Sequence, residues 1–227
     1  MSIKYFSVAL DGPSGSGKST VAKIISQRLN ILYLDTGAMY RATALKAIKS
    51  GVDCLDEKGV SGFINDIDLK VVYKDGTQHT ILDGEDVSTE IRRNEVSMQA
   101  SNISSLKCVR YKMVELQREI ASQMSCVLDG RDIGSFVLPN AQFKFYITAD
   151  SSVRAERRRK ELEARGQIVD FETLKKEIEQ RDYNDSHREI APLKKADDAV
   201  EIDTSNMSVD EVVSTIIGRI EEGLNVL

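Results

Sequence analysis

The chain has 227 residues, of which 30% are charged and 41% hydrophobic, the balance of a globular protein with one large domain or with a core that carries insertions. A net charge of −5 argues against DNA or RNA polymer as the main partner. Apolar runs are too short for a membrane span or a signal peptide, and the three cysteines lack zinc-type spacing, so we expect a reduced, cytoplasmic protein.

The first apolar run, residues 5–10, predicts a buried strand, and "GPSGSGKS" at 12–19 follows it and opens a predicted helix. This stretch fits the phosphate-binding pattern G-x-x-x-x-G-K-[ST] in the strand-to-helix context that the pattern needs. Backbone N–H groups would surround phosphate oxygens, Lys18 would reach the β and γ phosphates, and a hydroxyl of Ser19 or Thr20 would face Mg²⁺. We therefore assign ATP binding to Gly12, Pro13, Ser14, Gly15, Ser16, Gly17, Lys18, Ser19 and Thr20.

A second predicted strand, residues 31–35, leads into "DTGAMYRA" at 35–42. Thr36 can cap a helix, and Arg41 would then project from the first turns of that helix. Taken alone, this stretch is typical of a helix cap followed by a surface arginine.

Residues 69–88 interrupt the helix-strand alternation. Asp75-Gly76 and Asp83-Gly84 are good hairpin turns between segments with high strand propensity. They predict a small antiparallel meander that is inserted into the fold.

The third core strand, residues 126–129, ends in "DGRD" at 129–132. Ligands of open α/β sheets bind beyond the carboxyl ends of the strands, so we expect Arg41, Arg131 and the phosphate loop to face one crevice. Three charges at the end of a buried strand need partners. Where no acceptor is bound, we expect Arg131 to be hydrated, strained or paired with a neighbouring carboxylate.

The rest of the chain supplies two more strands, at 143–148 and 199–203, and a last helix after the capping box of Ser208 and Glu211. Strands that alternate with helices predict an α/β fold with a parallel sheet. Residues 151–190 are charged and predicted helical, with a break at Gly166, and are typical of a flap with little core of its own.

A phosphate loop alone does not define the function. A GTPase switch should carry N-K-x-D, but the chain has no Asn-Lys pair, and a motor or transporter ATPase should be longer. A small kinase with a second site for an acceptor remains. The alternative from another class is a nucleotide-binding or switch protein without an acceptor.

Six motifs together resemble the bacterial cytidylate kinases, also called (d)CMP kinases, over about residues 5 to 205. They are "LDGPSGSGKST", "LDTGAMYRA", "LDGRDIG", "RAERRRK", "RDYNDSHREIAPL" and "ADDAVEIDT". The resemblance implies a P-loop kinase fold with a five-stranded parallel sheet flanked by helices, an antiparallel β insert in the monophosphate-binding region and a helical lid. The implied segments are core 1–62, insert 63–100, core 101–150, lid and acceptor-contacting helix 151–190, and core 191–227.

The implied reaction is transfer of the γ-phosphoryl group of ATP to CMP or dCMP with Mg²⁺, by a monomer. A kinase that favours UMP or AMP is the nearest alternative. Such a reaction needs two anions held in line and their charge neutralised, which arginine, lysine and Mg²⁺ can do. By resemblance, Lys18, Arg131, Arg157 and Arg158 are catalytic, with Arg154 a weaker candidate in the same lid.

The resemblance also implies the CMP contacts: Thr36, Tyr40, Arg41, Ser101, Arg110, Arg131, Asp132, Arg181, Asp185 and Arg188. Arg41, Arg131 and Arg188 would grip the phosphate, because a guanidinium can donate two hydrogen bonds to one phosphate. Asp132, with Ser101 and Arg110, would read the base, since a carboxylate accepts from the amino group of cytosine.

Asp185 and Arg181 would contact the ribose. From their spacing alone, Arg181, Asp185 and Arg188 are typical of ion pairs on one solvated helix face.

Asp129 has two equally supported interpretations. It could contact Mg²⁺ through water, or it could pair with Lys18 or Arg131.

Overall fold

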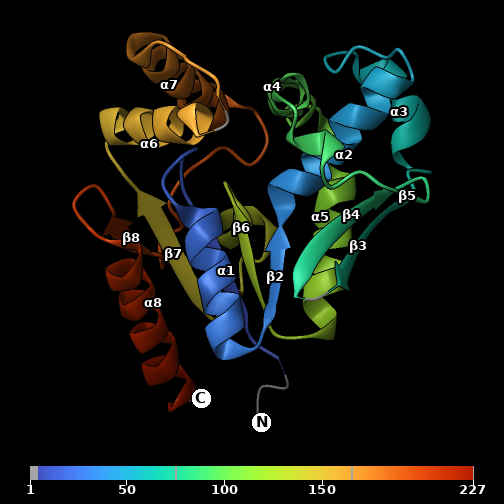
Figure 1. Cartoon of the computed structure of the whole chain (residues 1–227). Helices are drawn as coiled ribbons and strands as arrows, with labels where there is room; N and C mark the ends of the chain where they lie inside the picture. Colours follow the sequence, from blue (N-terminus) through green and yellow to red (C-terminus); the bar gives the residue numbers. More distant parts are fainter. Residues whose placement is uncertain (1–4, 75, 165, 227) are drawn as a thin grey trace. The chain divides into compact units, whose positions relative to one another are not determined.

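The computed structural model describes residues 5–74, 76–164 and 166–226 (Figure 1). The chain forms two compact units. The first comprises the part up to Tyr33 together with the part from Met124 onward, and the second comprises Leu34–Gln123. The five-segment division predicted above stays a prediction.

A five-stranded parallel sheet with the order β2-β6-β1-β7-β8 forms the centre of the first unit, and β2 runs across the division between the units. Its strands are β1 (Ser7–Asp11), β2 (Leu32–Asp35), β6 (Cys126–Gly130), β7 (Phe143–Thr148) and β8 (Val200–Asp203). β1 pairs in parallel with β6 and β7, and β7 pairs in parallel with β8. The five predicted strands and the predicted parallel sheet are therefore confirmed.

The strand register brings the phosphate loop and "DGRD" to the same edge of the sheet. Leu10 pairs with Asp129, and Asp11 pairs with Gly130 on one side and with Tyr146 on the other. β1 and β6 therefore end level with each other, and β7 continues past them to Thr148. The segments that follow β1 and β6 begin side by side, as ligand sites in open α/β sheets require.

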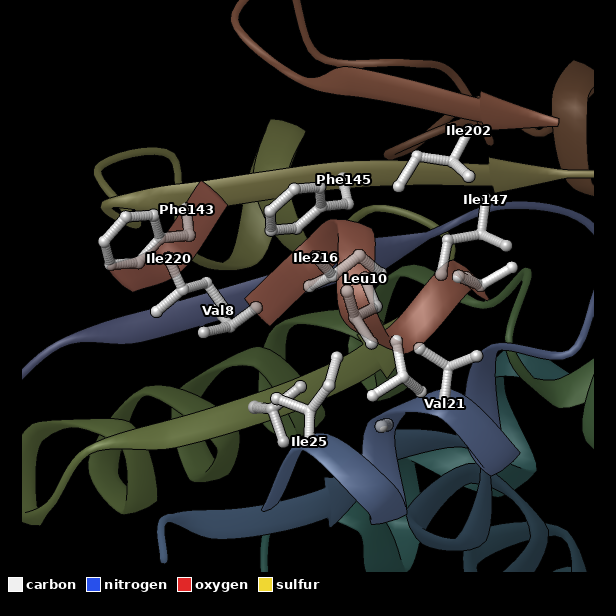
Figure 2. Packing of buried hydrophobic residues seen from close by; sticks show 14 of the residues in the cluster. Val8, Leu10, Val21, Ile25, Phe143, Phe145, Ile147, Ile202, Ile216 and Ile220 are labelled. Atoms are coloured by element: carbon white, nitrogen blue, oxygen red, sulfur yellow. The ribbon is translucent and has the colours of Figure 1, made fainter. Parts of the chain in front are cut away.

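The core of the first unit explains why the strands read as continuous apolar runs. Val8, Ala9 and Leu10 are all fully buried, because both faces of a parallel sheet are covered. On one face, α1 (Lys18–Leu29) and α8 (Val209–Leu224) pack their apolar sides against β1, β7 and β8 (Figure 2). The predicted capping box of Ser208 and Glu211 begins α8.

The lid segment, residues 151–190, contains α6 (Ser151–Glu163) and α7 (Phe171–His187), which pack against each other. Their buried apolar side chains include Leu162, Leu174 and Ile178, so the lid has a small apolar contact of its own. Gly166 lies between the helices with a φ of +75°, a conformation that favours glycine.

The second unit carries the predicted meander, a three-stranded antiparallel sheet of β3 (Leu69–Lys74), β4 (Thr77–Leu82) and β5 (Glu85–Asp86). Asp83 and Gly84 make the second turn, with φ angles of 50° and 84°. Asp75 of the first predicted turn lies outside the described residues. The helical segments of this unit are α2 (Thr36–Lys49), α3 (Glu57–Ile64), η1 (Glu90–Arg92), α4 (Asn94–Ile103) and α5 (Lys107–Gln123).

None of the helices in the described part of the chain combines the length and the apolar character that a membrane crossing requires.

Candidate active site

The phosphate loop follows β1 directly and continues into α1, and its glycines have conformations that other residues rarely adopt. Gly12 has a φ of +143°, and a Cβ at this position would lie 2.0 Å from the carbonyl oxygen of Ile147. Gly15 has a φ of +75°, and its Cβ would lie 3.3 Å from the Cβ of Arg154. Gly17, with a φ of 94°, is the N-cap of α1. The backbone therefore turns tightly just before the positive end of a helix, the arrangement that binds phosphates.

Lys18 is buried inside this loop. Its Nζ donates to the carbonyl oxygen of Pro13 at 2.6 Å and to Ser16 Oγ at 3.3 Å. Burial and the nearby charge of Arg131 lower the pKa of Lys18 well below its ordinary value, although Asp129 and Asp11 oppose the change. A lysine in such surroundings gains from an added anion, because the anion stabilises the charged form.

Asp129, at the end of β6, is held by hydroxyl groups. Its Oδ2 accepts from Ser19 Oγ at 2.5 Å, and its Oδ1 accepts from the hydroxyl of Tyr33 at 3.3 Å. The side chain of Ser19 thus joins the first turn of α1 to the end of the neighbouring strand. A hydroxyl and a carboxylate are oxygen donors of the kind that Mg²⁺ prefers, so these residues fit a magnesium site at the phosphate loop.

Arg131 is paired with a carboxylate, one of the three arrangements expected from the sequence. Its Nε donates to Asp185 Oδ2 at 2.9 Å, and its Nη1 donates to the carbonyl oxygen of Gly130 at 3.3 Å. Arg188 donates from Nη2 to Asp132 Oδ1 at 3.2 Å, and its Nη1 lies 3.9 Å from Asp185 Oδ1. Arg131, Asp132, Asp185 and Arg188, here called the acceptor network, therefore form one chain of alternating charges.

The charges of the acceptor network are largely removed from water. Asp132 is 4% exposed and Asp185 is 6% exposed. Burial raises the pKa of Asp185, but the charges of Arg131, Arg181 and Arg188 outweigh it and hold this pKa below its ordinary value. Asp185 is therefore a charged acceptor. The interpretation of these residues as a solvated helix face is wrong for Asp185 and Arg188.

Arg188 does not share the helix with Arg181 and Asp185 as their spacing predicts. The helix α7 ends at His187, and Arg188 is its C-cap with an extended backbone (φ −67°, ψ 146°). The turn of the chain at this point lets Arg188 reach Asp132 across the sequence. Of the two spacings, only that of four residues, between Arg181 and Asp185, lies within the helix.

The lid arginines have three different environments. Arg157 donates to the carbonyl oxygen and to Oγ1 of Thr204, at 2.8 and 3.1 Å, and Arg158 pairs with Glu161 at 3.0 Å. Arg154 is buried and contacts the phosphate loop itself, with Nη1 donating to the carbonyl oxygen of Ser14 at 2.9 Å. The catalytic roles of Arg157 and Arg158 stay predictions, whereas Arg154 is the lid arginine that contacts the loop.

Arg154 also links the loop to both lid helices. Arg154 lies in α6. Its Nε donates to the carbonyl oxygen of Ala149 at 2.9 Å, and its Nη2 pairs with Asp182 of α7 at 2.6 Å. Spacing could not single out this arginine among its neighbours in "RAERRRK", because only the packing of the helix decides which one is buried.

In the second unit, the cap of α2 is Asp35 and not Thr36. Asp35 Oδ1 accepts from the backbone N–H of Ala38 at 2.8 Å, and Thr36 is the first residue of the helix. Both residue types make good N-caps, and the choice depends on where β2 ends. The other oxygen of Asp35 accepts from Arg41 Nη2 at 2.9 Å, so the cap also orients the predicted phosphate ligand.

Arg110 is almost fully enclosed within the second unit. It is 1% exposed, its guanidinium lies over the ring of Tyr40 with Cζ 5.6 Å from the centroid, and Nη1 donates to the carbonyl oxygen of Ser104 at 3.4 Å. Arginine is rarely buried to this extent, so the position of Arg110 favours a structural or binding role over that of a solvent-exposed surface charge. Ser101 lies in α4, three residues before Ser104.

The predicted site residues thus form two groups. The first unit brings together the phosphate loop, Asp129, the acceptor network and Arg154. The second unit holds the other predicted site residues, Thr36, Tyr40, Arg41, Ser101 and Arg110. The crevice that Arg41 and Arg131 are predicted to share stays a prediction.

The sequence analysis did not identify Asp11 and Tyr33 as residues of the site. A carboxylate at the end of an apolar strand, the signal used for Asp129, would also have found Asp11.

Comparison with known proteins agrees with these motifs. The cytidylate kinase family model matches residues 8–222. The chain belongs to the cytidylate kinase family. It is 48% identical over 221 residues to the cytidylate kinase of Pediococcus pentosaceus, with 97% of each chain covered. It is 47% identical over 215 residues to that of Lactobacillus johnsonii, covering 95% of this chain and 94% of the relative.

A solved structure of an uncharacterized protein from Eubacterium ventriosum has a similar fold. The TM-score is 0.50 at 15% identity, with 95% of this chain and 98% of the other covered. Membership of the cytidylate kinase family makes the chain an ATP-dependent nucleoside monophosphate kinase, which confirms the family resemblance. The alternative of a P-loop switch protein without an acceptor is thereby excluded.

Proposed function

We propose that this kinase transfers the γ-phosphoryl group of ATP to CMP or dCMP, giving ADP and CDP or dCDP. The observation that carries the proposal is the acceptor network at the end of β6, next to the buried Lys18 in the loop after β1. Two sets of buried cationic groups at neighbouring strand ends suit a reaction that joins two phosphate-bearing substrates.

For the donor, we propose that the backbone of residues 12–20 and the side chain of Lys18 hold the phosphates of ATP. The positive φ angles of Gly12, Gly15 and Gly17 support this role, because they turn backbone N–H groups toward an anion. The lowered pKa of Lys18 supports it as well, since the charge of ATP would restore the ammonium form.

We propose that Ser19 and Asp129 hold Mg²⁺, Asp129 through water. Mg²⁺, when bound, offsets the negative charge of the phosphates. The contact of 2.5 Å between Ser19 Oγ and Asp129 Oδ2 supports this assignment, because it aligns two oxygen donors beside the loop. The charge of Asp129 also acts on Lys18 and Arg131, so the alternative in which Asp129 pairs with one of them stays a prediction beside the metal contact.

For the acceptor phosphate, we propose that Arg131 and Arg188 provide the grip in the first unit and that Arg41 contributes from the second. Each of the three now donates to a carboxylate, Asp185, Asp132 or Asp35. Phosphate offers an arginine the same charge-assisted geometry as a carboxylate does. A bound phosphate therefore competes with these acidic partners or adds to them.

For the base, we propose that Asp132 accepts from the exocyclic amino group of cytosine, with Ser101 and Arg110 as further contacts. Arg188 donates to one oxygen of Asp132 and so fixes the orientation of this buried side chain. Uracil would place a carbonyl oxygen where cytosine has its amino group, so two acceptors would face each other. Buried polar groups left unpaired in this way make a site reject the wrong base strongly.

For the ribose, we propose that Asp185 accepts from the 2′-hydroxyl, with Arg181 beside it.

In the reaction that we propose, an oxygen of the acceptor phosphate attacks the γ-phosphorus of ATP, and ADP leaves. Lys18, Arg131, Arg157 and Arg158 neutralise the charge that the transferring group carries. The reaction needs no histidine or cysteine nucleophile.

We also propose that the protein is a monomer and lies in the cytoplasm. Light scattering after gel filtration measures the molar mass in solution and so tests the monomeric state.

The test is an ADP-release assay with CMP, dCMP, UMP, AMP and GMP as acceptors at matched concentrations. We expect CMP and dCMP to give the highest kcat/KM. ATP turnover that does not rise on addition of CMP would contradict the proposed function, and equal turnover of UMP would contradict the proposed reading of the base by Asp132.

A further inference from the structure

Asp11 is the last residue of β1 and directly precedes the phosphate loop, yet its side chain contacts a different segment. Its Oδ1 accepts from the backbone N–H of Ile133 at 2.7 Å, and its Oδ2 accepts from that of Gly134 at 2.7 Å. Asp11 is 4% exposed. One buried carboxylate therefore uses both oxygens to hold two consecutive backbone groups more than a hundred residues away in the sequence.

These two N–H groups open a short helical turn, η2 (Ile133–Val137), which follows "DGRD". The first N–H groups of any helical turn lack partners within the turn and are usually satisfied by the side chain of the N-cap residue. The N-cap here is Asp132, a residue type well suited to capping, but Asp132 makes no such side-chain bond. Asp11 takes that place from the neighbouring strand.

The carboxylate of Asp132 does not cap its own turn and contacts another segment. Asp132 Oδ1 instead accepts from Arg188 within the acceptor network. Had Asp132 capped its own turn, its carboxylate would face the backbone of η2 and not the network. The cap that Asp11 provides thus determines which way the side chain of Asp132 points.

We infer that Asp11 is a positioning residue for the acceptor nucleotide. By capping η2 from β1, it holds Arg131 and Asp132 at the edge of the sheet, with the Asp132 carboxylate in the acceptor network. This inference rests on the proposed function of the acceptor network. It also ties the phosphate loop to the acceptor side through a single residue, because Asp11 is covalently joined to Gly12.

Close packing makes this contact specific. A Cβ on Gly134 would lie 3.1 Å from Lys144 Cδ and 3.4 Å from Asp11 Oδ2. Lys144 has little freedom to move away, because its Nζ is held by the carbonyl oxygen of Pro139 at 2.5 Å and by Asp198 at 2.7 and 2.9 Å. A Cβ at position 134 would therefore press on Lys144 and would lie against the carboxylate of Asp11.

The first variant is Asp11→Asn, which keeps the shape of the side chain but turns one acceptor into a donor that faces a backbone N–H. The start of the phosphate loop stays fixed, because the backbone of β1 is paired with β6 and β7 on both sides. We expect the KM for CMP to rise about tenfold, the usual effect of one lost bond to a buried donor. The KM for ATP should change by less than about threefold by the same reasoning.

The second variant is Gly134→Ala, which leaves all charges in place and acts by crowding alone. Its matched control is Gly218→Ala in α8, where a Cβ meets nothing within 4 Å. Gly134→Ala should raise the KM for CMP in the same direction as Asp11→Asn, and Gly218→Ala should leave it unchanged. This pair also tests the inference if Asp11→Asn does not fold.

A spectroscopic measurement tests the positioning independently of the substrate. At pH 8, where Asp11 is ionised, the amide proton resonances of Ile133 and Gly134 should move upfield in Asp11→Asn, because an amide bonded to a carboxylate is deshielded. Unchanged resonances would overturn the inference whether or not CMP is the acceptor. A KM for CMP within about twofold of wild type in both variants, or equal rises in the KM for CMP and for ATP, would overturn it as well. Failure of the wild-type enzyme to phosphorylate CMP would instead remove the proposed function.

Discussion

Arg131 donates from Nε to Asp185 Oδ2 at 2.9 Å, so the arginine proposed to grip the acceptor phosphate is paired with the carboxylate proposed to contact the ribose. Both side chains are largely buried, with 20% and 9% of their side-chain surfaces exposed. Asp185 keeps the guanidinium oriented and compensates its charge. The same carboxylate can then accept from a ribose hydroxyl, because each carboxylate oxygen accepts more than one hydrogen bond.

Asp185→Asn should therefore reduce the use of CMP more than that of dCMP, since only CMP has the 2′-hydroxyl. We expect kcat/KM for CMP to fall about tenfold further than kcat/KM for dCMP, the worth of one hydrogen bond to a charged group. Steady-state kinetics with both nucleotides measure the difference. The exposed Asp197→Asn serves as the control for loss of a charge. Equal losses for CMP and dCMP would remove the proposed ribose contact.

Lys18→Met should abolish most phosphoryl transfer while the protein still folds. Burial holds the pKa of Lys18 well below its ordinary value, so the fold gains little from this charge, whereas bound phosphates gain much from it. We expect kcat/KM to fall by a factor of about 10³, as when a group that stabilises the transition state is removed. Thermal unfolding checks the fold, and a large drop in the unfolding temperature would show that Lys18 is structural.

Arg154→Met should destabilise the protein much more than Arg158→Met. Removal of Arg154 leaves Asp182 without its partner in a partly buried place, with an expected loss of about 3 kcal/mol in the free energy of unfolding. Arg158 and Glu161 form an exposed pair that contributes less than about 1 kcal/mol. Urea unfolding of both variants, of Asp182→Asn and of the double variant Arg154→Met with Asp182→Asn provides the measurement. Simple addition of the effects of Arg154→Met and Asp182→Asn in the double variant would contradict the coupling of Arg154 with Asp182.

The stability of the protein should depend on pH through Asp11. Burial raises the pKa of Asp11 from 3.8 to about 7, with Asp132 adding to the rise and Lys18 and the N–H groups of Ile133 and Gly134 opposing it. The folded protein therefore binds this proton more tightly than the unfolded chain does. The resulting stabilisation is complete below pH 3.8 and is lost as the pH rises through about 7.

Urea unfolding at pH 5 and pH 8 tests this linkage in wild type and Asp11→Asn. The wild type should lose more of its free energy of unfolding between the two pH values than the variant, which cannot ionise at this position. The comparison removes the effect of other titrating groups, since both proteins share them. The same pH dependence in both proteins would contradict the raised pKa.

The strands and the phosphate loop could be predicted because local sequence determines them. Apolar runs such as residues 143–148 have to be buried on both faces, and the glycines at 12, 15 and 17 adopt conformations that few other residues tolerate. The meander followed from its turns in the same way, since Asp83 and Gly84 both have positive φ angles. Each of these features depends on residues that are close together in the chain.

The partners of the charged residues could not be predicted, because packing between distant segments decides them. The contact of Asp11 with Ile133 spans 122 positions, and nothing local to either residue indicates it. The burial of Arg154 depends on how α6 meets the phosphate loop. Arg188 lies one residue beyond α7, so the end of a helix determined its direction. Family resemblance singled out the side chains of the acceptor network, whose roles stay predictions, and the structure supplied their pairing.

The most direct test of the account compares kcat/KM for CMP with that for UMP in wild type and in Asp132→Asn. We predict that wild type prefers CMP and that Asp132→Asn narrows this preference by about tenfold or more, because the carboxylate no longer accepts from the cytosine amino group. Equal use of UMP and CMP by the wild type, or a preference that Asp132→Asn leaves intact, would contradict it.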